Sequence, residues 1–218
     1  MTVADDPGAP AYDDALDDLA ARVFRDDAPD RIEPLLSRFA EKVGPLLADD
    51  EQPQLWQALR VDWALCDAWL DHPGDTWAWR ATMGRVDGVT PTPADGTVAR
   101  SIAGVFEVWP GRTPWLREPT RGICLRLADH VVLQPPVDGE GPAALWGLRV
   151  CVAAESAFMC RPPLPFPLAA LRPIRDAARR RLAGEPDLLL RLYRGWLHFA
   201  RASRADAEAI FEAVLRPR

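Results

Sequence analysis

Arginines near the C-terminus form the densest group of side chains that could take part in binding or catalysis in this 218-residue chain. Arg172, Arg175, Arg179 and Arg180 recur at helical spacing. A guanidinium group can hold a phosphate through two parallel hydrogen bonds, so a helix carrying these residues could bind a nucleic-acid backbone. The chain as a whole is acidic, with a net charge of −6 and a pI near 5.1. Nucleic-acid binding by these arginine-rich C-terminal helices is therefore an alternative prediction, not the first.

The abundance of arginine itself carries little weight. Lys42 is the only lysine among 26 basic residues, and the chain also holds 22 prolines. This bias is typical of a bacterial genome rich in G and C. Selection for the forked geometry of arginine is not needed to explain it.

Tryptophan is the second unusual residue, with nine copies. Trp56 and Trp63 lie seven residues apart, which places them near one face of a helix and favours a packing seam. A tryptophan-lined binding groove is the competing interpretation. As candidate interaction residues we take Trp56, Trp63, Trp77 and Trp79. Binding would require exposed members among these and Trp69 and Trp196.

Catalytic and metal-binding motifs are missing from the sequence. The three histidines (His72, His130 and His198) are scattered, and the four cysteines form no CxxC pair. Cys124, Cys151 or Cys160 could meet His130 in a folded sheet, but an inert core thiol is the commoner outcome. No P-loop, GxSxG or dinucleotide fingerprint occurs. We expect no catalytic residues, no cofactor and no metal, and an enzyme of unknown type is the second alternative.

Charge is distributed unevenly along the chain. Residues 1–75 carry a net charge of −12, residues 76–160 of 0 and residues 161–218 of +6. The two ends could attract each other within one molecule, or between copies in self-association. The N-terminus lacks a signal-peptide pattern, and no apolar run is long enough to span a bilayer. The pattern of cysteines favours free thiols. We therefore expect a cytoplasmic protein that does not enter a membrane.

Helical patterns precede the centre of the chain. After a flexible tail at 1–12, apolar residues recur at helical spacing in three segments. These are 13–25, 29–43 and 53–70, followed by one or two turns within 93–100. The segment 76–86 fits a strand or a short helix, and the helix is favoured.

Short alternating segments follow, and they predict strands at 103–109, 115–118, 123–127, 130–134, 144–152 and 157–161. Tight turns separate them, which predicts a five- or six-stranded antiparallel small barrel or bent sheet. Four prolines in 161–167 predict an extended strap that places Leu164 and Phe166 over the sheet, with a PxxP-type ligand as the alternative.

Helices are expected again at 168–182, at 187–202 and after Ser203. The fold class is thus α+β, with N-terminal helices, the central barrel-like sheet and C-terminal helices. The regions are 1–12, 13–100, 101–161 and 162–218, expected to form one compact unit.

The central stretch resembles a module found in uncharacterised bacterial proteins that often carry a SEC-C zinc motif. The matching residues lie within about 97–167 and include Gly104–Val108, Pro110–Arg112, Trp115–Glu118 and Pro165–Pro167. The resemblance implies a small barrel beside helices and no particular activity. The cysteine-rich zinc tail of that family is missing, since Phe211–Arg218 holds no cysteine.

Taken together, these features favour a non-catalytic bacterial protein–protein interaction or adaptor protein. The uneven charge, the tryptophans and the lack of catalytic motifs support this reading.

Overall fold

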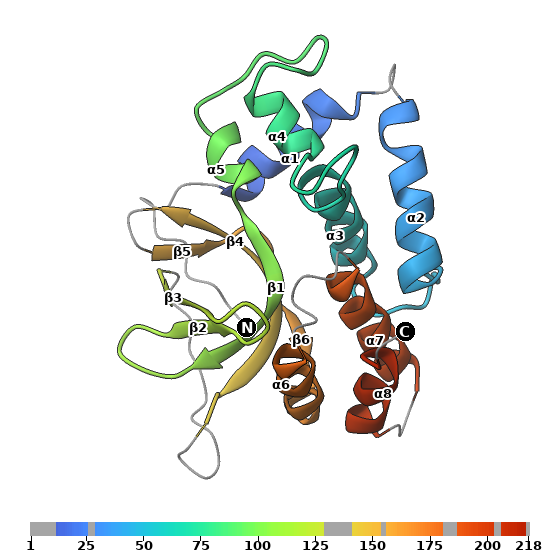
Figure 1. Cartoon of the computed structure of the whole chain (residues 1–218), viewed down its shortest axis with the longest axis vertical. Coiled ribbons are helices and arrows are strands. Elements are labelled where there is room, and N and C mark those ends of the chain that lie inside the picture. The colour runs from blue at the N-terminus through green and yellow to red at the C-terminus, as the bar shows by residue number, and fades with distance from the viewer. Residues whose placement is uncertain are drawn as a thin grey trace.

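The computed structural model describes residues 12–25, 29–128, 141–153, 156–180, 187–202 and 206–216. Figure 1 shows a barrel on one side of the molecule and helices on the other. The helices before the barrel are α1 (Tyr12–Val23), α2 (Glu33–Val43), α3 (Pro53–Cys66), α4 (Trp77–Thr82) and α5 (Asp95–Ala99). Those after it are α6 (Leu171–Arg179), α7 (Leu188–Arg201) and α8 (Ala207–Val214). Two single 3₁₀ turns, Pro29–Arg31 and Leu168–Ala170, precede α2 and α6.

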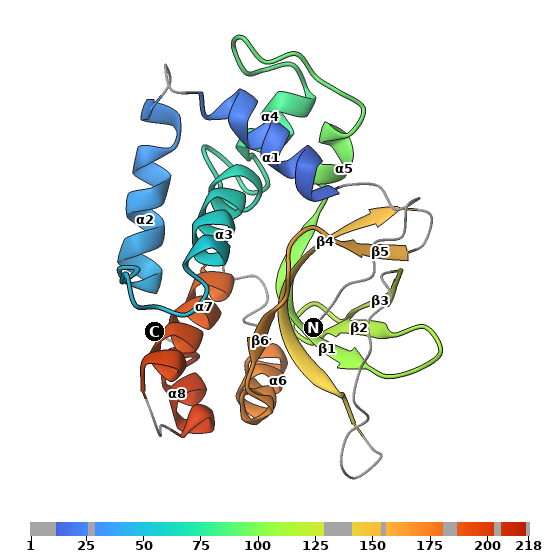
Figure 2. The same cartoon turned by 180° about the vertical axis from the view of Figure 1, so that it is seen from behind.

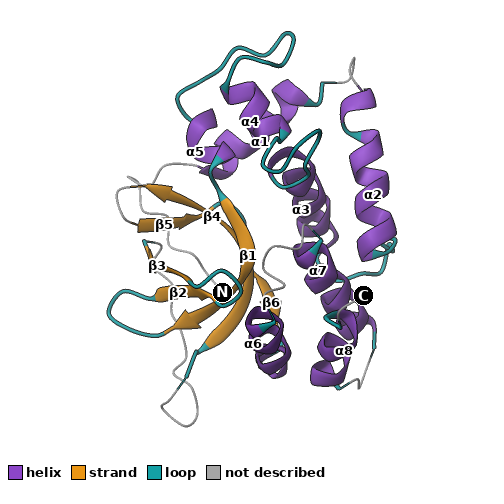
Figure 3. Cartoon of the chain, in the orientation of Figure 1, coloured by secondary structure: helices purple, strands orange, loops and turns teal. Residues whose placement is uncertain are grey.

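The strands are β1 (Ile102–Trp109), β2 (Trp115–Glu118), β3 (Ile123–Leu127), β4 (Ala144–Ala153), β5 (Ser156–Met159) and β6 (Leu164–Phe166). The first five close into a barrel in the order β1-β2-β3-β5-β4, and β4 pairs back with β1. β6 adds to the β4 edge, where Leu145 pairs with Phe166. The predicted α+β class with a small barrel between two helical regions is confirmed (Figure 3).

One pairing departs from the antiparallel prediction. β3 and β5 run parallel, with Arg126 opposite Ser156. The reason is geometric, because a closed ring of five strands cannot alternate direction at every step. One pair must then point the same way.

Several predicted elements match the structure closely. β2 and β3 begin and end at the predicted residues, and the ambiguous segment 76–86 forms the helix α4, capped by Thr76, whose hydroxyl accepts from the Trp79 N–H. The proline strap pairs as β6, with Leu164 0% and Phe166 5% exposed. The predicted strand at 130–134 and all but the last residue of the tail at 1–12 lie outside the described residues.

The main core joins helices from both ends of the chain to the barrel. Phe39 and Trp56 from the N-terminal helices, Val105 and Leu145 from the barrel, and Trp196 from α7 belong to one buried cluster. A second cluster, including Phe106, Leu116 and Leu148, fills the barrel itself. β1 is therefore buried on both faces, with helices outside it and the barrel interior inside (Figure 2).

No helix in the described ranges has the length and apolar character that crossing a bilayer requires.

Candidate functional site

The predicted arginine face is largely engaged in contacts within the chain. Arg175 donates two hydrogen bonds, of 2.7 and 2.9 Å, to the buried carboxylate of Glu107, and so joins α6 to the barrel. Arg172 pairs with Glu208 at 2.9 Å, and Arg179 with Asp176 at 2.8 Å. Arg180 donates from Nε to the backbone carbonyl of Asp176. The structure therefore gives each predicted arginine a partner on α6, on α8 or in the barrel.

The predicted tryptophans differ in exposure. Trp56 and Trp63 are 0% and 2% exposed, so they pack the core and offer no contact surface to a partner. Trp77 is half-buried, with the guanidinium carbons of Arg31 and Arg80 each 5.7 Å from its ring centre. Trp79 is 41% exposed and Trp69, in the loop after α3, is 37% exposed. Of these five tryptophans, Trp69 and Trp79 present the largest aromatic area outward.

Trp69 and Trp79 line the same cavity, of about 380 Å³, which we call the junction cavity. It lies where the end of α3, the loop to α4, the start of α7 and the β2–β3 turn meet. Its apolar wall includes Leu188, Leu189 and Leu192 from α7. Its volume lies within the ordinary range of ligand-binding pockets.

Arg121 supplies the positive charge of the junction cavity. It sits in the turn Pro119–Gly122, and Gly122, at φ +68°, adopts the left-handed conformation that this turn requires. Its Nε lies 3.4 Å from Glu118 Oε2, and its Nη2 donates to the carbonyl of Ala103. Within the described part of the chain, its Nη1 has no hydrogen-bonding partner. One face of the guanidinium is thus fixed and the other remains available.

Gly104 makes this position of Arg121 sterically feasible. A Cβ atom at Gly104 would lie 2.9 Å from Arg121 Nη2 and 3.0 Å from Glu118 Cγ. Both distances are too short for undisturbed packing. The glycine in β1 therefore lets the Glu118–Arg121 pair lie against the strand at the edge of the cavity.

The other ionisable groups of the junction cavity are already engaged. Glu118 is 2% exposed and accepts from the Thr120 hydroxyl and the Arg121 backbone N–H, both at 2.6 Å. Asp67 is ion-paired with the buried Arg149. Burial raises the pKa of the Cys66 thiol to about 12, so it is protonated at neutral pH. No activated nucleophile with a free general base is present among the described residues of this cavity.

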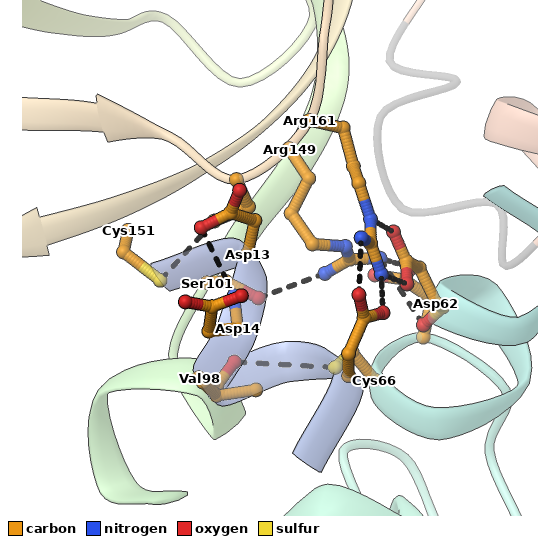
Figure 4. Close-up of polar contacts among 12 residues, drawn as sticks. Asp13, Asp14, Asp62, Cys66, Val98, Ser101, Arg149, Cys151 and Arg161 are labelled. Atoms are coloured by element: carbon orange, nitrogen blue, oxygen red, sulfur yellow. Dashed lines mark hydrogen bonds and ion pairs between the residues drawn. The ribbon is translucent and has the colours of Figure 1, made fainter. Parts of the chain in front are cut away.

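Behind Asp67 lies a second arrangement, which we call the buried ion-pair network: Asp17, Asp62, Asp67, Arg149 and Arg161. Arg161 donates to both Asp62 oxygens at 2.9 and 3.0 Å, and also pairs with Asp17. Arg149, 2% exposed, donates to Ser101 at 2.8 Å as well as to Asp67. Figure 4 shows Arg149 and Arg161 side by side, both reaching toward Asp62 on α3. The network joins α1 and α3 to β4 and to the residues after β5.

Metal-binding residues do not gather in the part of the chain that the structure describes, where no group of three His, Cys, Asp or Glu side chains converges. Of the predicted thiol–imidazole contacts, His130 lies outside the described residues. The sequence indicates Trp69 and Trp79 as candidate contact residues, but neither Arg121 nor Asp67. Only the Pro119–Gly122 turn could have drawn attention to Arg121.

No protein-family model, curated protein or solved structure matches this chain. The resemblance of residues 97–167 to the SEC-C-associated module therefore stays a prediction.

Proposed function

We propose that this protein is a non-catalytic interaction protein, and that its junction cavity binds a peptide segment of a partner protein. The observation that carries the proposal is that two exposed tryptophans, Trp69 and Trp79, line one cavity beside an arginine with an available nitrogen. Tryptophan and arginine are the side chains that most often dominate binding energy at protein interfaces.

The cavity chemistry defines the expected peptide. The two indole rings and the α7 leucines favour a bulky apolar side chain, because its burial removes exposed aromatic area from water. The outward nitrogen of Arg121 favours a carboxylate close to that side chain. The expected ligand is therefore an extended segment that combines a large apolar residue with a neighbouring Asp or Glu.

Binding is favoured over catalysis because the ionisable groups of the cavity are already hydrogen-bonded, ion-paired or protonated. Glu118 accepts hydrogen bonds from Thr120 and from the Arg121 backbone N–H, Asp67 is ion-paired with Arg149, and burial keeps the Cys66 thiol protonated. Among the described residues of the cavity, these groups do not form a pair of activated nucleophile and free general base. A bacterial cytoplasm is the compartment we propose, supported by the four free cysteines.

A random dodecapeptide library displayed on phage provides the test. We expect selection on the wild-type protein to enrich peptides with a bulky apolar residue beside an acidic one. The affinity of a selected peptide, measured by fluorescence polarisation, should fall about tenfold or more in Trp79→Ala. Trp115→Ala is the matched control, since Trp115 is 46% exposed on β2 and lies outside the junction cavity.

The contribution of Arg121 can be isolated separately. Arg121→Met should weaken the acidic peptide more than the same peptide carrying Gln in place of Glu. Equal weakening of both peptides would contradict the assigned carboxylate contact. Failure to select any peptide, or selected peptides that bind Trp79→Ala and the wild type equally, would contradict the proposed function.

A further inference from the structure

Two buried thiols lie in contact on the side of the barrel that faces α1 and α5. The sulfur atoms of Cys151 and Cys160 are 3.3 Å apart, and the residues are 0% and 1% exposed. Cys151 is in β4 opposite Phe158, and Cys160 donates its backbone N–H to Arg149. The register therefore makes the two cysteines diagonal neighbours on one face of the β4–β5 ladder.

Little movement separates this arrangement from a covalent bond. A disulfide has a sulfur–sulfur distance of about 2.05 Å, so the two atoms would need to approach by roughly 1.3 Å. Rotation of the two side chains can supply a shift of that size.

The surroundings make the two thiols unequal. The hydrogen bond donated by Cys160 lowers the pKa of Cys151, and the same bond, with burial, raises the pKa of Cys160. The guanidinium of Arg149 also favours a thiolate at Cys151. Because Cys160 is the donor of the 3.3 Å contact and Cys151 the acceptor, we assign Cys151 as the attacking thiol and Cys160 as the resolving thiol.

We propose that Cys151 and Cys160 form a dithiol modification site, which hydrogen peroxide converts into a disulfide between β4 and the residue after β5. The Cys151 thiolate attacks one peroxide oxygen, an S–O bond forms, the O–O bond breaks, and the departing hydroxide takes a proton to become water. The Cys160 sulfur then attacks the sulfenic sulfur, an S–S bond forms, and a second water leaves with the thiol proton. Two thiols and one peroxide thus give one disulfide and two waters.

Burial selects the oxidant. Peroxide is close to water in size, so a small local opening of the structure admits it, whereas a larger disulfide reagent needs a wider one. The other two cysteines provide internal comparisons: Cys124 is exposed and Cys66 is half-buried. In the described structure, Cys151 and Cys160 are the thiols that hydrogen-bond to each other.

Peptide mapping tests the proposal on the full chain. The protein is treated with hydrogen peroxide, the peroxide is removed with catalase, and the protein is unfolded in denaturant containing N-ethylmaleimide, which alkylates free thiols. It is then digested with a protease that cleaves after glutamate. Glu155 lies between the two cysteines, so cleavage there leaves their peptides joined only if the disulfide has formed. We expect a linked pair that dithiothreitol separates, and a melting temperature that rises by several degrees on oxidation and falls again on reduction.

Two variants sharpen the assignment. Cys124→Ala should form the linked pair as the wild type does, and Cys160→Ser should lose it. The proposal is overturned if both thiols of the oxidised wild type carry maleimide, or if Cys151 is found joined to Cys66 or Cys124. The peptide map of the oxidised wild type tests the Cys151–Cys160 disulfide even where a variant does not fold.

Discussion

The buried ion-pair network and the junction cavity share Asp67, and both lie where helices meet the barrel, yet they differ in what faces water. In the network, Arg149 and Arg161 donate to carboxylates, to Ser101 and to the backbone carbonyl of Asp62, and Arg149 is almost fully enclosed, with its Nε lacking a partner among the described residues. At the cavity, Nη1 of the partly exposed Arg121 has no partner in the described part of the chain, and the indoles of Trp69 and Trp79 are exposed. The same residue types therefore stabilise the fold in one place and form the proposed binding surface in the other. Burial and partners decide the role, not residue identity.

The largest expected effect comes from breaking the buried ion-pair network. Arg149→Met should lower the free energy of unfolding by about 3–5 kcal/mol, because it leaves the Asp67 carboxylate without its partner. Urea denaturation followed by circular dichroism measures this loss. A loss below about 1 kcal/mol would show that the network contributes little and would remove the contrast with the cavity.

Tryptophan substitutions give the next largest difference. Trp56→Ala should cost about 3 kcal/mol or more, since the ring is fully buried and packs against Tyr193 and Trp196. Trp79→Ala should cost less than about 1 kcal/mol, because its ring is already 41% exposed. Thermal and urea unfolding of the two variants side by side provide the measurement. Equal losses would mean that Trp79 serves the fold and not a partner.

A smaller effect is expected at Asp50, which Arg201 contacts through two 2.7 Å hydrogen bonds. These bonds lower the pKa of Asp50 in the folded protein. As the pH falls, the Asp50 carboxylate is therefore protonated in the unfolded chain before it is protonated in the folded one. The stabilisation is therefore complete above about pH 4 and is lost as the pH falls through the lower folded-state pKa. Asp50→Asn should cost about 1 kcal/mol at pH 7, with Arg201 partly exposed.

The pH profile of unfolding distinguishes that explanation from simple loss of packing. The difference in stability between Asp50→Asn and the wild type should shrink below pH 4. A difference that stays constant down to pH 2 would contradict the role assigned to the Asp50 charge.

The smallest effect is expected on the arginine face of α6. Arg172 is 72% exposed, and its pair with Glu208 faces solvent, so Arg172→Ala should change the free energy of unfolding by less than about 0.5 kcal/mol. Urea unfolding of this variant beside Arg149→Met compares an exposed charge with a buried one directly. A cost above about 2 kcal/mol would mean that exposure does not separate the two classes of arginine.

Variants of the arginine face of α6 also test the alternative prediction that the protein binds nucleic acid. Because Arg172, Arg175 and Arg179 have acidic partners within the chain, we expect no salt-dependent binding to a mixed-sequence DNA duplex or single strand. Binding at low ionic strength that Arg172→Ala and Arg179→Ala together abolish would favour the alternative over the peptide-binding proposal.

Local patterns predicted much of the fold. The alternation in 115–118 and 123–127, with the proline and glycine turn between them, specifies a hairpin without reference to the rest of the chain. The helical stripe through Trp56 and Trp63 likewise predicts burial, and both side chains are buried. The exit segment 164–166 was expected to lie extended over the sheet, and it pairs with β4.

The candidate site could not be predicted in the same way. The junction cavity brings together Asp67, Trp79, Arg121 and Leu188, which are far apart in sequence and meet only through tertiary packing. Nor does spacing indicate which arginine will be buried: Arg149 lies in an alternating strand and Arg172 on a basic helix, yet the strand residue is enclosed. Pairing of Cys151 with Cys160 depends on the β4–β5 register, which the sequence alone leaves undetermined.

Peptide binding in the junction cavity is tested most directly by a nuclear magnetic resonance titration of the tryptophan indole N–H signals. The nine tryptophans give separate probes across the molecule. With a selected peptide added, we expect the Trp69 and Trp79 signals to shift with the binding isotherm and the signal of the exposed Trp115 to stay in place. Saturation of the protein with unchanged Trp69 and Trp79 signals, or with Trp115 shifting instead, would contradict binding in the junction cavity.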